Sequence, residues 1–218
     1  MKRLITDIQI QKNHPSRLSI FLDGKFYCGV SEEVTVRHQL KKGTIVDENE
    51  LKELLHDEEF SNAKKYVYNI LARRMYSSSE IQKKLKEQGY TDEIINDVIS
   101  MMERYGYVDD KTFAEEWVQS RTQNKPKGKI VIRRELKGKG IEEDTIDEVL
   151  DQVIDESKQT DLLLDMARRK ARSYKNDDLI SAKRKLQGYL IRRGFDFETV
   201  RNVVDKVLKE DNSVYDRS

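Results

Sequence analysis

The sequence predicts a mainly α-helical fold: three tandem three-helix, helix-turn-helix-like repeats in an elongated array, preceded by a small antiparallel β-sheet and helix unit. A helix-turn-helix pattern with a central glycine occurs three times, with Gly89, Gly140 and Gly194 at intervals of 51 and 54 residues. Apolar residues fall at matching offsets from each glycine, which is the signature of a repeat architecture. In addition, 37% of the residues are hydrophobic and 37% are charged, which suits an array whose units all lie near the surface.

Strand signals occur only in the N-terminal unit, residues 1–60. Apolar and polar residues alternate from Leu4 to Gln11, and two further β-rich runs cover residues 17–22 and 25–30. The Asp23-Gly24 pair between these two runs is a strong type I′ hairpin signal, and residues 14–16 are expected to form a loop. We therefore expect three short antiparallel strands.

Two helices should follow the strands. The first is expected over residues 31–42 and should end at Gly43. Asp47 should cap the second, with Glu50 completing a capping box. This unit differs from everything after it.

The first repeat, residues 61–110, carries the clearest copy of the pattern. Its leading helix is expected over residues 63–76. Ser77 is a good N-cap for the next helix, and Glu80, three residues on, completes a capping box. Gly89 should end that helix in a left-handed C-cap conformation, and an amphipathic third helix with acidic residues in its first turn follows.

The same order of elements is expected in the second repeat, residues 111–157, and in the third, residues 158–210. Their leading helices should cover residues 111–123 and 160–174. Residues 211–218 should form a frayed tail.

Composition favours a cytoplasmic address. The single cysteine, Cys28, excludes an internal disulfide and is typical of a reducing compartment. The N-terminus is too polar for a signal peptide, and no apolar run reaches membrane-spanning length. A monomer is expected, because no large apolar stripe is left over once the repeats are packed.

Charge is banded along the chain, although the net charge is only +1. Residues 121–140 contain eight basic residues and one acid, and residues 168–193 contain ten basic residues and two acids. Between these two basic bands, residues 141–165 carry ten acids and one lysine. We expect the basic bands to meet a polyanion, since contacts of lysine and arginine with phosphates give salt-dependent affinity. Solvated helix faces with ion pairs between neighbouring units are the alternative.

The loop over residues 125–129 favours the functional interpretation, because its five residues include three lysines and no acid, and we expect these lysines to have no local partner. The candidate partner-binding or DNA-binding residues are all basic. They are Arg73, Arg74, Arg121, Lys125, Lys127, Lys129, Arg133, Arg134, Lys137, Lys139, Arg168, Arg169, Arg172, Lys183, Arg184 and Lys185.

No catalytic constellation is visible. The three histidines are scattered, and with one cysteine they give no site of metal-ligand spacing. Phosphate-binding loops, nucleophile elbows and dinucleotide fingerprints are missing. We therefore expect no enzymatic activity, no metal and no cofactor.

Direct reading of DNA sequence is also disfavoured. The helix after each central glycine begins with acidic residues, which would repel phosphates. Four aromatic residues are candidates for stacking on bases, although their helical spacing favours a place in the core. They are Tyr66, Trp117, Tyr189 and Phe195.

A shared motif runs through the repeats: an arginine, then a serine and a Glu-Leu pair, then a leucine and a glycine, with a Phe-Ala pair added in the second repeat. In the second repeat the matching residues are Phe113-Ala114, Arg121, Gly128, Glu135-Leu136 and Gly140-Ile141. In the first they are Arg73 or Arg74, Ser78, Glu80-Ile81, Leu85 and Gly89, with isoleucine in place of the leucine of the pair. The third keeps Leu186, Leu190 and Gly194 without a Glu-Leu pair. With these residues the repeats resemble those of the RecX family, regulators of the RecA recombinase.

The resemblance covers residues 61–210, and the N-terminal sheet resembles an extension of longer family members. It implies a curved chain of three tandem three-helix repeats without enzymatic activity. It also implies binding in the groove of the RecA filament on single-stranded DNA, with effects on ATP hydrolysis, strand exchange and filament growth during DNA repair and the SOS response. Two alternatives remain, a nucleic-acid-binding protein that acts independently of RecA and a helical-repeat scaffold for another protein.

Overall fold

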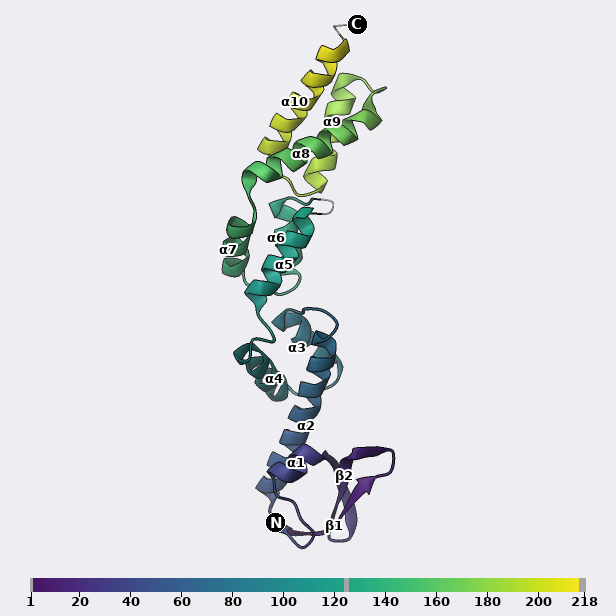
Figure 1. Ribbon diagram of the computed structural model, residues 1–218, viewed down its shortest axis with the longest axis vertical. Helices are drawn as coiled ribbons and strands as arrows, with labels where there is room; N and C mark the ends of the chain where they lie inside the picture. The colour runs from purple at the N-terminus through teal and green to yellow at the C-terminus, as the bar shows by residue number, and fades with distance from the viewer. Residues whose placement is uncertain (1, 124–125, 216–218) are drawn as a thin grey trace. The chain divides into compact units, whose positions relative to one another are not determined.

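The computed structural model describes residues 2–123 and 126–215, with residues 210–215 as backbone only (Figure 1). The chain divides into two compact units. One comprises Met1–Tyr76 and Ile81–Val108, and the other comprises Ser77–Glu80 and Asp109–Ser218. The predicted fold class is confirmed: helices dominate, and a small antiparallel sheet lies at the N-terminus.

The sheet has four antiparallel strands in the order β3-β2-β1-β4. Their bounds are β1 Arg3–Gln11, β2 His14–Leu22, β3 Lys25–Ser31 and β4 Ile45–Val46. The turn at Asp23-Gly24 is confirmed, since both residues have positive φ, 49° and 79°. The loop predicted at residues 14–16 is wrong, because these residues already belong to β2. Since β3 pairs with β2 only from Arg17 onward, Pro15 lies where its missing N–H costs no bond to β3.

The first helix, α1 (Glu32–Arg37), is shorter than predicted. It ends at His38, and Gln39 then takes a left-handed conformation with φ of 51°. The following residues turn back to the sheet, where Gly43 N donates to Ile5 O over 2.8 Å. Pairing with β1 therefore replaces the helical bonds that the predicted helix over residues 31–42 needed, and it leads into β4.

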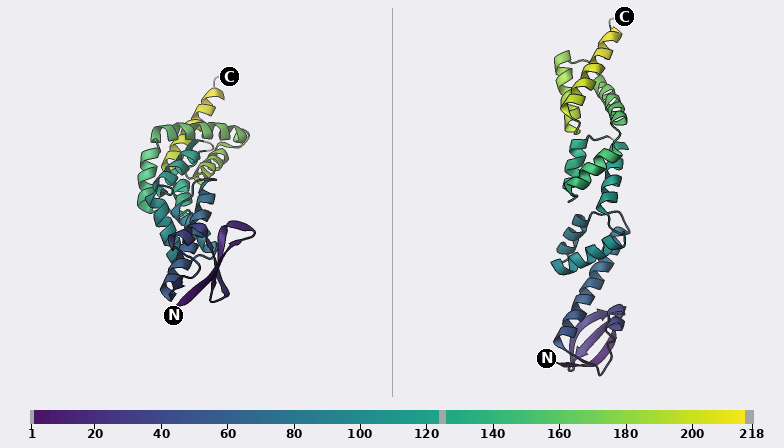
Figure 2. Two further views of the ribbon diagram at one scale, coloured as in Figure 1. Left: turned by 60° about the horizontal axis from the view of Figure 1, so that its bottom comes forward. Right: turned by 90° about the vertical axis from the view of Figure 1, so that its left-hand side faces the viewer.

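The next helix, α2 (Glu48–Leu71), is one continuous helix where the sequence predicted two. The predicted capping box is confirmed, because Asp47 Oδ1 accepts from Glu50 N over 3.0 Å and Asp47 N donates to Glu50 Oε2 over 2.6 Å. No glycine or proline interrupts the helix. Its first half packs on the sheet through Leu51, and its second half packs in the first repeat through Val67, so residue 60 lies inside it. Figure 2 shows the strands beside the start of this helix.

The three predicted repeats are present, each with its own apolar core. After α2, the first contains α3 Ser78–Glu87 and α4 Asp92–Arg104. The second contains α5 Asp110–Gln123, α6 Lys129–Lys137 and α7 Glu143–Val153. The third contains α8 Glu156–Ala171, the short 3₁₀ helix η1 Arg172–Tyr174, α9 Leu179–Arg192 and α10 Phe197–Tyr215. The central glycines Gly89, Gly140 and Gly194 have φ of 87°, 76° and 89°, as the predicted left-handed C-caps require.

The glycine turns also join successive elements within the second unit. Ser77, at the start of α3, donates through Oγ to the carbonyl oxygen of Lys139 over 2.7 Å. In the same way, Gly128 N at the start of α6 donates to Arg193 O over 2.9 Å. In both cases a carbonyl oxygen in the glycine turn of one repeat accepts a hydrogen bond from the start of a helix in the preceding repeat. Along the described ranges, none of the helices combines the length and apolar character needed to cross a bilayer.

Candidate polyanion-binding surface

The basic band of the second repeat is largely neutralised by acids of the same unit. Glu135, on α6, lies at the centre of one cluster. Its Oε2 accepts from Arg121 Nε over 3.0 Å and from Trp117 Nε1 over 3.1 Å, and its Oε1 accepts from Lys127 Nζ. Burial opposes ionisation of this carboxyl, but the hydrogen bonds from Lys127, Arg121 and Trp117 outweigh it and hold the Glu135 pKa below its ordinary value of 4.5.

Most other cations of this band also have acidic partners. The pairs are Lys129 with Glu156 (3.1 Å) and Asp151 (3.5 Å), Arg133 with Glu143 (2.7 Å) and Asp147 (2.5 Å), Lys137 with Glu143, and Lys139 with Glu80 (2.8 Å). The prediction that the lysines of residues 125–129 have no local partner is wrong for Lys127 and Lys129, and Lys125 lies outside the described residues. Helices α6 and α7 pack together, so the acidic band of the sequence lies beside the basic one.

Three motif residues of the second repeat, Phe113, Arg121 and Glu135, therefore belong to an internal brace around Trp117. The Trp117 ring stacks on Phe113 at 5.9 Å between centroids. The Arg121 guanidinium lies 4.0 Å and the Lys139 ammonium 4.3 Å from the centroid of the Trp117 ring. Of the four candidate stacking aromatics, Trp117 is thus already covered by protein groups.

Two candidates lie just beyond α2 in the first unit. Arg73 and Arg74 are both exposed. The Arg74 guanidinium lies 3.6 Å from the centroid of the Tyr76 ring and donates to Met75 O over 2.9 Å. These contacts restrain Arg74 locally, while its exposed position leaves it accessible.

The third repeat holds a group of cations for which the described residues supply no acidic partner. Arg169 and Lys170 lie on α8, and Arg193 caps the end of α9. Lys170 Nζ and Arg193 Cζ lie 5.5 Å and 5.3 Å from the centroid of the Tyr189 ring. Arg169 Nε donates to the backbone oxygen of Asp165 over 3.3 Å. Among the residues that the structure describes, no carboxylate oxygen lies within 4 Å of these three cations.

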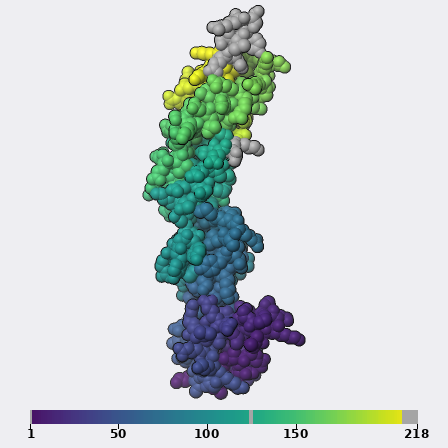
Figure 3. Space-filling view, in the orientation of Figure 1, coloured from purple at the N-terminus to yellow at the C-terminus, as the bar shows by residue number. Residues whose placement is uncertain are grey.

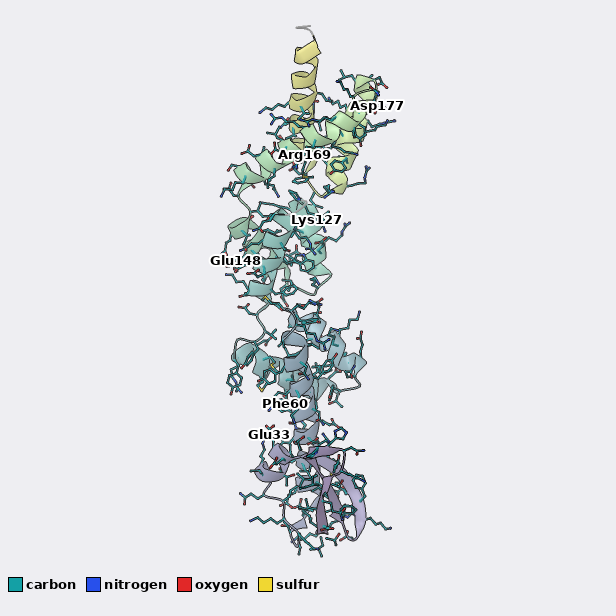
Figure 4. All side chains as sticks on the ribbon, turned by 45° about the vertical axis from the view of Figure 1, so that its right-hand side comes forward. Glu33, Phe60, Lys127, Glu148, Arg169 and Asp177 are labelled. Atoms are coloured by element: carbon teal, nitrogen blue, oxygen red, sulfur yellow. The ribbon has the colours of Figure 1, made fainter. Side chains whose placement is uncertain are left out.

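These side chains line a pocket of about 430 Å³, together with Leu162 and Met166. We call it the cation–tyrosine pocket, defined by Leu162, Met166, Arg169, Lys170, Tyr189 and Arg193. Figure 4 labels Arg169 on α8, and α8 and α9 are green in the space-filling view of Figure 3. The predicted set included Arg169 but missed Lys170 and Arg193. The spacing of Tyr189 and Arg193, four residues apart on a helix, was the signal that they are neighbours.

The remaining candidates fall into two groups. Some have acidic partners: Lys183 with Asp205 (2.6 Å), Lys185 with Asp177 (2.9 Å) and Arg168 with Asp165 (3.8 Å). The others are exposed and have no acid within 4 Å in the described part of the chain: Arg134, Arg172 and Arg184. Of the candidates without an acidic partner in the described part of the chain, Arg169, Arg172 and Arg184 lie in the third repeat.

Comparison with known proteins gives matches along nearly the whole chain. The family model described as the regulatory protein RecX N-terminal domain matches residues 3–47. The models of the first, second and third three-helix domains of RecX match residues 63–100, 109–150 and 157–204.

The chain matches relatives named regulatory protein RecX over most of the length of those relatives. One from Bacillus licheniformis is 31% identical over 98% of this chain and 81% of that protein. One from Clostridioides difficile is 30% identical over 95% of this chain and 97% of that protein. A crystal structure described as regulatory protein RecX has a TM-score of 0.75 and 29% identity, covering 93% of this chain and 99% of that chain.

Proposed function

The chain belongs to the RecX family of regulatory proteins, and from this premise we propose that it is a non-enzymatic modulator of the RecA recombinase. In this proposal it binds in the groove of the filament that RecA forms on single-stranded DNA, as a monomer in the cytoplasm. Binding alters ATP hydrolysis, strand exchange and filament growth. The observation that carries the proposal is the similarity to regulatory RecX proteins along the N-terminal unit and all three repeats.

The charge distribution supports a polyanionic partner. Cations without an acidic partner in the described residues, such as Arg169, Arg172 and Arg184, gain more from a phosphate than cations that must first leave a carboxylate. We therefore assign contact with the filament or its DNA to the third repeat, with Arg134 of α6 and the exposed Arg73 and Arg74 as further contacts. The paired cations around Glu135 are assigned to the brace of the second repeat.

A bound protein changes the activity of a filament only if it binds one filament state more tightly than another. The test is the rate of ATP hydrolysis by RecA on single-stranded DNA as the chain is added. Binding to the bare strand is measured in parallel at two salt concentrations. We expect the rate to change well below the concentrations that saturate bare DNA.

The two alternatives give different results in the same assay. An unchanged rate with salt-sensitive binding to the bare strand would replace the proposal with a nucleic-acid-binding protein that acts independently of RecA. If neither the rate nor the bare strand responds, a scaffold for another protein replaces it.

A further inference from the structure

The cation–tyrosine pocket differs from an ordinary basic surface because it combines cations with an apolar, aromatic lining. We propose that it binds one nucleotide of single-stranded DNA, with the phosphate between Arg169 and Arg193 and the base against Tyr189. The inference deepens the proposed function, on which it rests for the source of the strand. It assigns the direct DNA contact to one site of the third repeat.

Composition and size of the pocket fit this ligand. Three of its side chains are cations, none of the described residues that line it is acidic, and Leu162 and Met166 supply apolar surface. Its volume of about 430 Å³ falls in the range of pockets that hold small molecules. Aromatic side chains flanked by cations are the usual means of binding single strands, since each base has a face that can stack and each phosphate carries a charge.

The proposed contact with Tyr189 requires a single strand. A base can reach the Tyr189 ring only when it is free of a partner strand, because bases in a duplex are stacked and paired. An acidic peptide would satisfy Arg169 and Arg193 but would leave the lining of Leu162, Met166 and Tyr189 without a planar apolar partner. The lining therefore favours a nucleotide.

The site is held in shape by the contact between the second and third repeats. The carbonyl oxygen of Arg193 accepts from Gly128 N over 2.9 Å, and that of Gly194 accepts from Ile130 N over 3.2 Å. These bonds fix the backbone that carries the Arg193 side chain. Gln123 and Pro126 of the second repeat complete the rim. A ligand therefore meets a cation and an aromatic ring whose backbones are already positioned, which lowers the entropic cost of binding.

The test uses the full chain and an oligothymidine carrying one photoreactive 4-thiothymidine. After irradiation, the cross-linked peptide is identified by mass spectrometry, and binding to the same strand is measured by fluorescence anisotropy. The variants are R169E/R193E, Y189L and Y189F. The double variant K12E/K25E changes the net charge equally through exposed lysines of the first unit and serves as the control. Circular dichroism confirms that each variant is folded.

We expect the cross-link on the peptides that contain Tyr189 or Met166. R169E/R193E should lower the magnitude of the slope of log affinity against log salt by about 0.7, the value for one lost phosphate contact on a single strand, and K12E/K25E should not. Y189L should bind about tenfold more weakly, while Y189F, which keeps the ring, should bind as the wild type does.

Cross-links that lie only outside the pocket would overturn the proposal, and so would equal binding by Y189L and Y189F. Competition by polyglutamate as effective as that by oligothymidine would show a site for acidic chains instead. The same proteins are added to RecA filaments to separate the two claims. If the wild type changes ATP hydrolysis but cross-links elsewhere, only the pocket is refuted. If it cross-links in the pocket without affecting RecA, only the proposed regulation of RecA fails.

Discussion

Gly194→Ala should destabilise the chain far more than Gly89→Ala, although both glycines end a helix in a left-handed conformation. Their φ angles are almost equal, 89° and 87°. The difference lies in their surroundings. A Cβ at residue 89 would meet nothing within 4 Å, whereas a Cβ at residue 194 would lie 2.6 Å from both the backbone nitrogen and Cγ2 of Val131.

The magnitudes follow from these contacts. A left-handed conformation costs a non-glycine residue about 1 kcal/mol, which is the whole expected cost of Gly89→Ala. At Gly194 the added Cβ must also push α9 and the start of α6 apart. That movement breaks the bonds from Gly128 N to Arg193 O and from Ile130 N to Gly194 O, each worth about 1 kcal/mol. The total for Gly194→Ala is therefore about 3 kcal/mol.

Hydrogen exchange measured by NMR tests this difference locally. In Gly194→Ala the amides of Gly128 and Ile130 should exchange at least about tenfold faster than in the wild type, because roughly 1.4 kcal/mol corresponds to a factor of ten. In Gly89→Ala their protection should be unchanged. Gly128→Ala provides a matched test without backbone strain, because residue 128 has a φ of −77°, which any residue adopts. An added Cβ there would lie 2.0 Å from Gly194 O, so only the close contact is tested. Equal destabilisation by Gly194→Ala and Gly89→Ala, with unchanged exchange at both amides, would refute the reasoning.

Three further predictions concern charged and titratable residues. Glu135→Gln should lower the free energy of unfolding, measured in urea, by about 2 kcal/mol at neutral pH. Because folding lowers the Glu135 pKa, the stabilisation by the Glu135 carboxylate is present above about pH 4.5 and is lost as the pH falls through the pKa of the folded state. A stability difference between the variant and the wild type that persists in strong acid would contradict this. Burial raises the pKa of Cys28 to about 11, so iodoacetamide should alkylate the native chain at pH 8 much more slowly than the urea-unfolded chain, and equal rates would contradict this. Arg133→Glu should destabilise the second repeat by up to about 1 kcal/mol in thermal melting, because the pairs of Arg133 with two acids become repulsive. Arg134→Glu should change stability by no more than about 0.5 kcal/mol but should weaken filament binding. The opposite order would show that the ion pairs do not decide the roles of these two residues.

Local signals in the sequence were reliable because the groups that decide them are close along the chain. The capping box of Asp47 and Glu50 and the left-handed glycine at residue 89 each depend on a few adjacent residues. The break expected near residue 60 failed for the opposite reason. Helix α2 continues because its two halves pack on different cores, and that support is tertiary.

The candidate site was only partly predictable for a related reason. Charge bands are visible in a sequence, but ion pairing depends on which helices lie side by side. Glu135, the one acid in its band, neutralises Lys127 and Arg121, and the acids of α7 neutralise others. In the third repeat, the absence of a described carboxylate near Arg169 and Arg193 emerged only from the packing of α8 and α9. The sequence alone therefore could not show which repeat has cations without an acidic partner among the described residues.

The central claim, that this chain regulates RecA by binding its filament, is tested most directly by binding itself. The fluorescently labelled chain is titrated with RecA filaments assembled on single-stranded DNA with a non-hydrolysable ATP analogue. Bare strand at the same nucleotide concentration and RecA without DNA are the comparisons. We expect binding to the filament that is clearly tighter than to either component, and weakened by R169E/R193E but not by K12E/K25E. Binding to the filament no tighter than to the bare strand would contradict it.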